Sequence, residues 1–337
     1  MNAARRSRRA RSRPARRRIL PLMLAAVALL AIIAIVLVVL WVQGLRGGAP
    51  QPPGTSTTPS TPSTRPEAQS ADCPDVLTLV VPGTWESAAD DDPDNPTANP
   101  RSLMLRVSSA LKEQFPESRT EVYTVPYVAQ FRNPTNLNDH QADYNDSRTQ
   151  GYKRAAGKII STHERCPLTR YVIMGFSQGA VISGDLASAI GNGRGGVLPA
   201  EDADLVLGVG LIADGRRQPG DQRDITPSPP GVGAEISLSG MGTLVPGITM
   251  TGPRTGGFGS VRDKVVSICA PGDLICDAPT VTNPLGAVNQ LLGALNNPVH
   301  ALYATPRYWS HDGATATQWM LGWSQNLIDA APRPAHN

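Results

Sequence analysis

The sequence predicts an α/β protein with a mainly parallel central sheet, and two observations lead to this prediction. Short apolar runs such as Tyr171–Met174 are typical of strands buried on both faces of a parallel sheet. Between these runs, segments such as residues 101–115 repeat apolar side chains at helical spacing, as at Leu103, Val107 and Leu111. Strands that alternate with helices favour a parallel sheet, because parallel neighbours need a long crossover connection.

The remaining elements follow the same alternation along the chain. Strands are expected at residues 75–85, 119–128, 171–174, 204–214 and 264–273. Helices are expected at residues 101–115, 146–166, 178–190 and 314–328. Asp146 or Ser147 is expected to cap the second helix, because a short polar side chain accepts a hydrogen bond from the exposed backbone N–H groups there. Residues 215–263 are rich in glycine, proline and polar residues and are expected to form an irregular insertion.

The first 42 residues differ in composition from the rest of the chain. Residues 1–18 hold nine arginines and no acid, and residues 19–42 are 24 uncharged, mostly apolar residues. Such a stretch is long enough to cross a bilayer as a helix, and the arginines before it predict a cytoplasmic tail and an exported remainder. The alternative is a cleaved signal peptide. Its apolar region would be only about 7–15 residues long, with a small-residue cleavage site that is missing here.

Residues 43–72 are expected to link the membrane helix to a folded domain. Glycine, proline, serine and threonine dominate residues 46–72, so this stretch cannot bury a core. An extended polyproline-like chain rises about 3.1 Å per residue, so the stretch would span at most ~80 Å. The linker would hold the domain away from the membrane.

Residues 73–337 are enough for one domain with a single core. Beyond residue 45 the chain carries 22 basic and 28 acidic side chains, a net charge of −6, although the whole chain has a net charge of +3. The overall positive charge therefore belongs to the N-terminal tail. It gives no reason to expect a nucleic-acid partner.

The four cysteines, Cys73, Cys166, Cys269 and Cys276, all lie on the exported side. An even number of cysteines in that context predicts two disulfides. No Cys-x-x-Cys pair is present, which argues against zinc. The acidic segment "DDDPDNP" (90–96) lacks the glycine and the glutamate that a calcium loop requires, so no metal is expected.

The segment "GFSQG" (175–179) has the pattern Gly-x-Ser-x-Gly directly between a predicted strand and a predicted helix. In that context a sharp turn exposes the Ser177 hydroxyl at the carboxyl end of the strand, and the glycines leave room for the turn. The backbone N–H of Gln178 would point at a developing oxyanion at the helix N-terminus. We therefore interpret Ser177 as a nucleophile. The alternative is a serine that only caps the helix.

A nucleophilic serine needs an acid and a histidine, which follow it in that order on such a fold. Asp273 lies at the end of a predicted strand, in "CAPGDLIC", where the two flanking cysteines could close a tight loop. Its alternative role is that of an ordinary turn aspartate. The histidines after the serine are His300, His311 and His336. His336 is one residue from the chain end, where disorder is expected, and His311 is expected on a turn beside Asp312.

Three motifs together resemble the cutinase family of serine esterases, and most closely the membrane-anchored cutinase-like proteins of mycobacteria and corynebacteria. The motifs are "GFSQG", "CAPGDLIC" and "HALY", and the similarity spans about residues 73–330. The resemblance implies an α/β-hydrolase fold, a three-layer sandwich with a mainly parallel central sheet. It favours His300 over His311 as the base, because "HALY" matches the family's His-x-x-Tyr.

The resemblance also implies further residue assignments. "PGT" (82–84) matches the family's oxyanion loop, so the Thr84 N–H would be a second oxyanion donor beside Gln178. Trp85 and the long segment 191–263 depart from small cutinases and leave the shape of the acyl site open. The implied disulfides are Cys73–Cys166 and Cys269–Cys276.

The expected activity is hydrolysis of carboxylic esters through an acyl-enzyme, in which His300 takes the Ser177 proton and Asp273 holds the imidazolium. No metal or organic cofactor is needed. The resemblance and the membrane helix imply lipid acyl esters as substrates (phospholipid, thioester or envelope lipid) and a catalytic domain anchored to the cell membrane and exported to the cell envelope. Two alternatives remain. One is an acyltransferase that passes an acyl or mycoloyl group to a sugar or lipid alcohol, and the other is a surface protein without catalysis.

Overall fold

The computed structural model describes residues 65–337, with gaps at 134, 135, 137, 240–245, 280–285, 287–289, 291, 292, 295 and 296. The predicted basic tail (1–18), membrane helix (19–42) and linker as far as residue 64 lie outside the described residues. In the part that is described, no helix is both long and apolar enough to span a bilayer.

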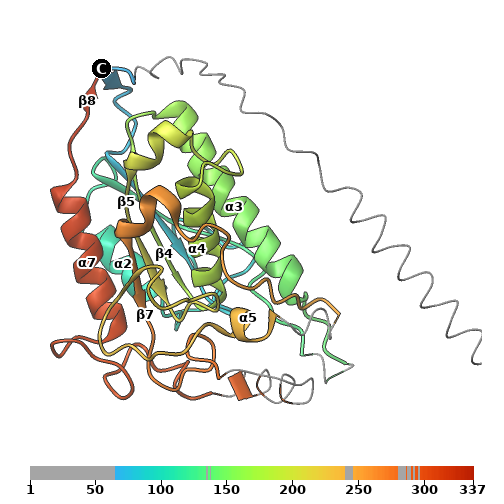
Figure 1. Ribbon diagram of the computed structural model, residues 1–337. Coiled ribbons are helices and arrows are strands. Elements are labelled where there is room, and N and C mark those ends of the chain that lie inside the picture. The colour runs from blue at the N-terminus through green and yellow to red at the C-terminus, as the bar shows by residue number, and fades with distance from the viewer. Residues whose placement is uncertain are drawn as a thin grey trace, which may run out of the picture. The chain divides into compact units, whose positions relative to one another are not determined.

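Parallel strands in the order β3–β2–β4–β5–β7–β6 form the central sheet of the described chain. Figure 1 labels β4, β5 and β7 of this sheet. The strands are β2 (Val76–Val81), β3 (Thr120–Thr124), β4 (Arg170–Phe176), β5 (Val206–Ile212), β6 (Arg223–Asp224) and β7 (Val265–Ile268). Nearly every residue of the central strands β2, β4 and β5 is buried, as expected where both faces of a parallel sheet are covered. The predicted parallel sheet is confirmed.

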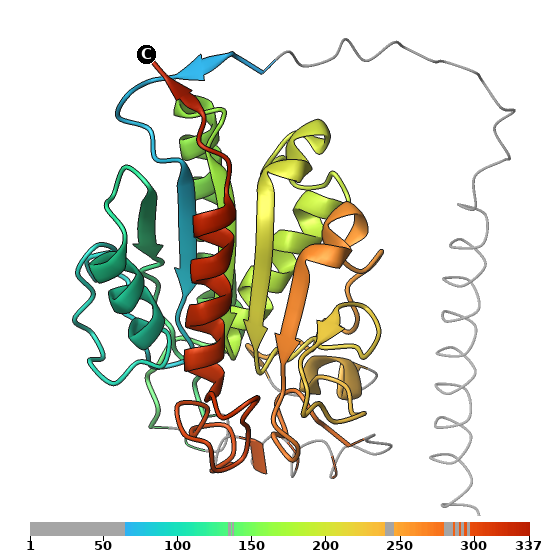
Figure 2. The same ribbon diagram turned by 90° about the vertical axis from the view of Figure 1, so that its left-hand side faces the viewer.

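Helices cover both faces of this sheet and complete a three-layer α/β sandwich (Figure 2). They are α2 (Leu105–Gln114), α3 (Tyr144–Arg165), α4 (Gln178–Gly191), the short α5 (Ala234–Ser237) and α7 (Ala316–Ala330). On one face, Ile159 of α3 and Ile182 of α4 pack in one core cluster with β2, β4 and β5. On the other face, Val107 of α2 and Met320 of α7 pack in a second cluster with the same strands.

The two ends of the described chain pair with each other. β1 (Ala68–Gln69) and β8 (Ala335–His336) form a parallel two-stranded sheet. Arg65, just before β1, makes an ion pair with Asp202 at 2.7 Å. The Gln69 side chain is buried and accepts a hydrogen bond from the backbone N–H of Leu168. The N-terminal stretch thus belongs to the folded part of the protein.

Three expectations from the sequence about the chain ends and helix α3 are wrong. Residues 65–72 are not linker, and His336 lies in a strand rather than in a disordered tail. A two-residue strand receives its hydrogen bonds from the far end of the chain, so local composition gives no sign of it. Helix α3 begins at Tyr144, before the expected start, and its cap is Asp143, which accepts a hydrogen bond from the Asp146 N–H at 3.0 Å.

Candidate active site

Ser177 is the single residue between strand β4 and helix α4. Its φ of 55° lies in the left-handed region, which costs a residue other than glycine on the order of 1–3 kcal/mol. Hydrogen bonds on both sides hold this turn. The Ser177 N–H donates to the carbonyl oxygen of Ile212 at 2.9 Å, and the Ser177 carbonyl accepts from the Val181 N–H at 3.0 Å. The turn presents the hydroxyl at the carboxyl edge of the sheet.

The two glycines of "GFSQG" fit this turn because the backbone around them is crowded. A Cβ on Gly175 would lie 2.2 Å from the carbonyl oxygen of Gly179. A Cβ on Gly179 would lie 2.1 Å from the carbonyl oxygen of Val81, on the neighbouring strand β2. No residue with a side chain fits at either position, which explains the pattern on either side of Ser177.

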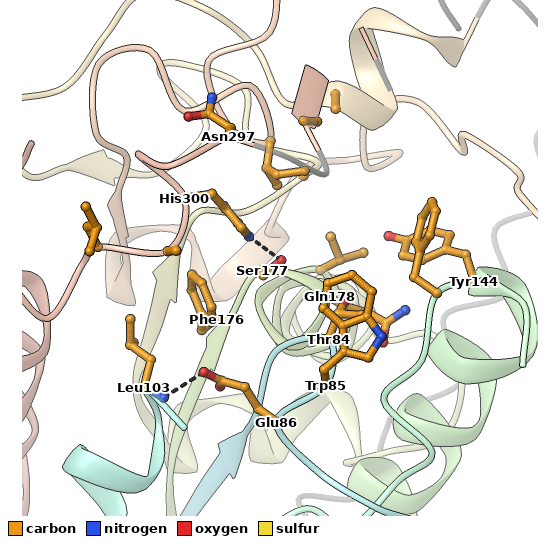
Figure 3. Close-up of a pocket in the computed structure, with 18 of the residues that line it drawn as sticks. Thr84, Trp85, Glu86, Leu103, Tyr144, Phe176, Ser177, Gln178, Asn297 and His300 are labelled. Carbon is orange, nitrogen blue, oxygen red and sulfur yellow. Dashed lines mark hydrogen bonds between the residues drawn. The ribbon is translucent and has the colours of Figure 1, made fainter. Parts of the chain in front are cut away.

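The predicted histidine and acid lie next to Ser177 (Figure 3). The Nε2 atom of His300 is 2.8 Å from the Ser177 Oγ, and its Nδ1 atom is 2.9 Å from Oδ2 of Asp273. Asp273 follows strand β7, and His300 belongs to the loop before helix α7. The Phe176 ring stacks on the imidazole at a centroid distance of 4.9 Å. In this geometry the imidazole can take the hydroxyl proton while the carboxylate holds its other nitrogen.

The Asp273 carboxylate is fully buried and well supplied with hydrogen bonds. Burial raises the pKa of Asp273, but the His300 imidazole and hydrogen bonds from Tyr303 and the Ile275 N–H lower it, and the net pKa lies below the usual value. The Tyr303 hydroxyl donates to Oδ2 at 2.7 Å, and the Ile275 N–H donates to Oδ1 at 3.0 Å. Asp273 is therefore held as a carboxylate that can balance a positive imidazole.

Both disulfides implied by the family resemblance are present. Cys269 and Cys276, seven positions apart, bracket the turn that carries Asp273. Cys73, just before β2, is bonded to Cys166, the C-terminal cap of α3. The first bond restrains the acid turn, and the second joins two segments 93 positions apart.

His311, the alternative base, lies elsewhere. Its Nδ1 atom is 2.6 Å from the carbonyl oxygen of Thr226, and its Nε2 atom is 3.6 Å from the Asp312 carboxylate. The expected placement of His311 beside Asp312 is confirmed. Of the two histidines, His300 is the one that contacts Ser177.

The two predicted oxyanion donors flank the serine. Gln178 is the first residue of α4, and the loop that carries Thr84 packs against the turn, where a Cβ on Gly83 would lie 2.7 Å from the Phe176 ring. Within the described residues, neither the Thr84 N–H nor the Gln178 N–H donates a hydrogen bond. Both groups are therefore available to a ligand oxygen beside Ser177.

A pocket of about 520 Å³ opens around Ser177 and His300, a size that is ordinary for a small-molecule site. Its wall is largely apolar, with side chains that include Phe131, Val181, Leu238, Met250, Ile275 and Ala294. Leu238 and Met250 belong to the irregular insertion. The insertion thus shapes the pocket, a role that the sequence left open.

A buried carboxylate ties the insertion to helix α3. Glu235, on α5, is 2% exposed and lines the pocket. It accepts hydrogen bonds from the Tyr144 hydroxyl at 2.5 Å, from Arg148 at 2.8 Å and from the Thr251 hydroxyl at 2.5 Å. These bonds span α3, α5 and the segment after it, so this wall of the pocket has a defined shape.

Sequence reasoning did not single out Glu86, Tyr303 or Glu235. Tyr303 is the last residue of "HALY", and its spacing from His300 is a family signal. Glu235 is the only charged residue in "GVGAEISLSG", a composition that fits a buried, paired acid. Glu86 precedes an acidic stretch, so nothing in its surroundings marks it as buried. Among the described residues, no group of three or more His, Cys, Asp or Glu side chains could hold a metal ion.

The parallel sheet, the serine at its strand–helix turn and the Ser–His–Asp chain of hydrogen bonds define a protein of the α/β-hydrolase class. The cutinase family profile matches residues 95–289. A carboxylesterase Culp6 homolog from Corynebacterium glutamicum is 48% identical over 270 residues, which are 78% of this chain and 84% of that protein. The chain belongs to the cutinase family, and it is an ester hydrolase.

Solved structures with a similar fold are much less similar in sequence. A cutinase-like protein from Cryptococcus sp. is 17% identical, with a TM-score of 0.43, over 80% of this chain and 100% of that one. The catalytic core of an acetyl xylan esterase from Trichoderma reesei is 17% identical, with a TM-score of 0.42, over 68% of this chain and 98% of that one.

Proposed function

We propose that the chain hydrolyses acyl esters of lipids through an acyl-enzyme on Ser177, while it is anchored to the cell membrane with its catalytic domain in the cell envelope. The observation that carries the proposal is the hydrogen-bond chain from Asp273 through His300 to Ser177, beside a largely apolar pocket. The substrates that we propose are phospholipids, thioesters or envelope lipids.

The chemistry follows from these positions. His300 Nε2 takes the proton of the Ser177 hydroxyl while Oγ attacks the acyl carbon, and the N–H groups of Thr84 and Gln178 stabilise the oxyanion. The protonated His300 then gives its proton to the leaving alcohol or thiol, and the bond from that group to the acyl carbon breaks. Water, deprotonated by His300, releases the acid from Ser177.

Three observations support the substrate class and the location. The apolar side chains of the pocket suit an acyl chain, and Leu238 and Met250 of the insertion extend its apolar wall. The two disulfides suit an oxidising compartment outside the cytoplasm. The uncharged segment 19–42 has the length of a membrane helix.

The experiment is a series of nitrophenyl esters of increasing chain length, run beside a phospholipid and an acyl-CoA. We expect kcat/KM to rise with chain length until the pocket is filled and then to level off. Turnover of acetyl esters alone would contradict the lipid substrate. In a parallel arm with a sugar acceptor, free acid should remain the main product. Acyl sugar as the main product would identify an acyltransferase instead.

A further inference from the structure

In the loop before Glu86, one backbone N–H has no partner among the described residues. The Gly83 N–H donates to the Glu86 carboxylate at 3.0 Å, and the Glu86 N–H donates to the Gly83 carbonyl oxygen at 3.1 Å. The Trp85 N–H donates to the carbonyl oxygen of Ala129. Of these four consecutive residues, only Thr84 has an N–H that finds no acceptor in the described part of the chain. The Thr84 N–H is therefore able to donate a hydrogen bond to a ligand oxygen.

The Glu86 carboxylate joins this loop to the start of helix α2. Its Oε1 atom accepts from the Leu103 N–H at 2.6 Å, as Figure 3 shows. Its Oε2 atom accepts from the Gly83 N–H at 3.0 Å and from the Ser102 hydroxyl at 3.1 Å. An N–H can only donate, so both carboxylate oxygens must accept. An amide at this position would turn an NH₂ group toward one of these donors.

The loop needs such an anchor because its backbone is strained. Trp85 has a φ of 64°, a conformation that costs a bulky residue on the order of 1–3 kcal/mol. Trp85 is 52% exposed, so burial does little to hold it, although its indole N–H donates to the Gln141 side chain at 2.6 Å. Burial raises the pKa of Glu86, hydrogen bonds from Leu103 and Gly83 lower it, and the net pKa is raised. The hydrogen bonds that Glu86 accepts from Gly83 and Leu103 link this strained loop to the start of α2 and point to a role in holding the backbone.

We propose that Glu86 is a positioning residue for ester hydrolysis. Its ionised carboxylate holds the loop so that the Thr84 N–H stays free and faces the oxyanion that forms beside Ser177. The proposal rests on the proposed function. Glu86 lines the pocket, but its carboxylate is bonded to the loop and to the start of α2, so we expect its effect in the transition state rather than in binding of the substrate.

The test is Glu86→Gln, which keeps the size of the side chain and removes one acceptor. We expect kcat to fall at least about ten-fold, up to the roughly 10²–10³-fold cost of losing one oxyanion donor. KM should stay within about two-fold of wild type, because an interaction made in the transition state is lost. An alkyl trifluoromethyl ketone, which forms an oxyanion on the serine, should bind more weakly by the same factor as the loss of kcat/KM. The end point of fluorophosphonate labelling counts the folded active sites.

Asp185→Asn is the matched control. Asp185 is a largely buried carboxylate on α4 that pairs with Arg216 and Arg254 and does not line the catalytic pocket. This variant should lose stability yet keep kcat and ketone affinity per active site. Equal losses of kcat in both variants would overturn the proposal, and so would wild-type kcat and ketone affinity in Glu86→Gln.

A second variant covers the case in which Glu86→Gln does not fold. Ser102→Ala removes one of the three donors to Glu86 and should lower kcat by a smaller factor at unchanged KM. Wild-type kcat in Ser102→Ala would then overturn the proposal. Failure of the proposed function looks different: the wild-type protein would neither hydrolyse esters nor react with the fluorophosphonate.

Discussion

His300 touches both other members of the hydrogen-bond chain, and this double contact distinguishes it from the remaining histidines. His300→Ala should lower kcat for a nitrophenyl ester by roughly 10⁴-fold or more, because Ser177 loses its base. His311→Ala should keep kcat within about two-fold, since His311 binds Thr226 and does not contact the serine. Comparable losses in the two variants, measured at equal active-site concentration, would refute this assignment.

After His300, Tyr303 is one of the groups that lower the pKa of Asp273. Its buried hydroxyl donates to Asp273 and accepts from the Ala270 N–H. In Tyr303→Phe the pKa of Asp273 should rise, because a hydrogen bond that lowers it is lost. A carboxylate that binds protons more tightly also stabilises a proton on the His300 imidazole that it faces, and a protonated imidazole cannot act as the base. The variant should therefore lose activity at a higher pH than wild type on the acid side of the kcat/KM profile.

Tyr308→Phe is the control for that profile. The Tyr308 hydroxyl makes no hydrogen bond with the described residues, so its removal should leave the acid side of the profile in place. Tyr303→Phe should also lower the melting temperature, because a buried Ala270 N–H without an acceptor costs about 1–3 kcal/mol. If the acid side of the kcat/KM profile of Tyr303→Phe lies at the same pH as in wild type, Tyr303 does not act on Asp273.

For single residues, the sequence was sufficient to predict those that belong to recognisable motifs. Ser177, Asp273 and His300 were predicted from local patterns and family spacing, and the structure brings them together. Glu86 and Glu235 could not be predicted, because their roles depend on partners from distant parts of the chain. The composition around Glu235 fits a buried acid but does not show its partners, and nothing near Glu86 in sequence marks it.

Among the secondary-structure elements, apolar patterning located the long ones well. Strands β2, β4, β5 and β7 and helices α2, α4 and α7 lie inside or close to their expected ranges. Their burial is set by their own residues, so the pattern is visible locally. The insertion was not predictable in shape, since most of its described residues form loops held by side-chain bonds such as those to Glu235.

The small sheet of β1 and β8 carries a pH-dependent contact. His336 bonds to the Asp75 carboxylate at 3.0 Å and lies 3.1 Å from the carbonyl oxygen of Ser70, and both contacts raise the pKa of His336. A histidine with a raised pKa in the folded state stabilises fully below its unfolded pKa, and this stability is lost as the pH rises through the folded pKa.

His336→Ala should therefore lower the melting temperature at pH 5.5 and have much less effect at pH 9. The measurement is thermal unfolding of wild type and variant at both pH values. His140→Ala is the control, because the His140 ring makes no hydrogen bond within the described residues. A loss that is the same at both pH values would mean that charge on His336 does not contribute.

For the whole catalytic domain, the parallel sheet separates the two ends of the described chain from the pocket. β1 and β8 lie near Asp75, which precedes strand β2 at the amino edge of the sheet. Ser177 follows strand β4 at the carboxyl edge. Arg65, the first described residue, is therefore close to the edge of the sheet opposite the catalytic serine.

Reaction with an alkyl fluorophosphonate, followed by peptide mass spectrometry and an ester assay on the same sample, tests the central claim most directly. The account predicts one adduct, on the peptide with Ser177, and loss of hydrolysis in proportion to labelling. Ser177→Ala should show no adduct and no turnover at a wild-type melting temperature, since the change removes one oxygen and opens little space. An adduct on another residue, or hydrolysis that persists in Ser177→Ala, would contradict it.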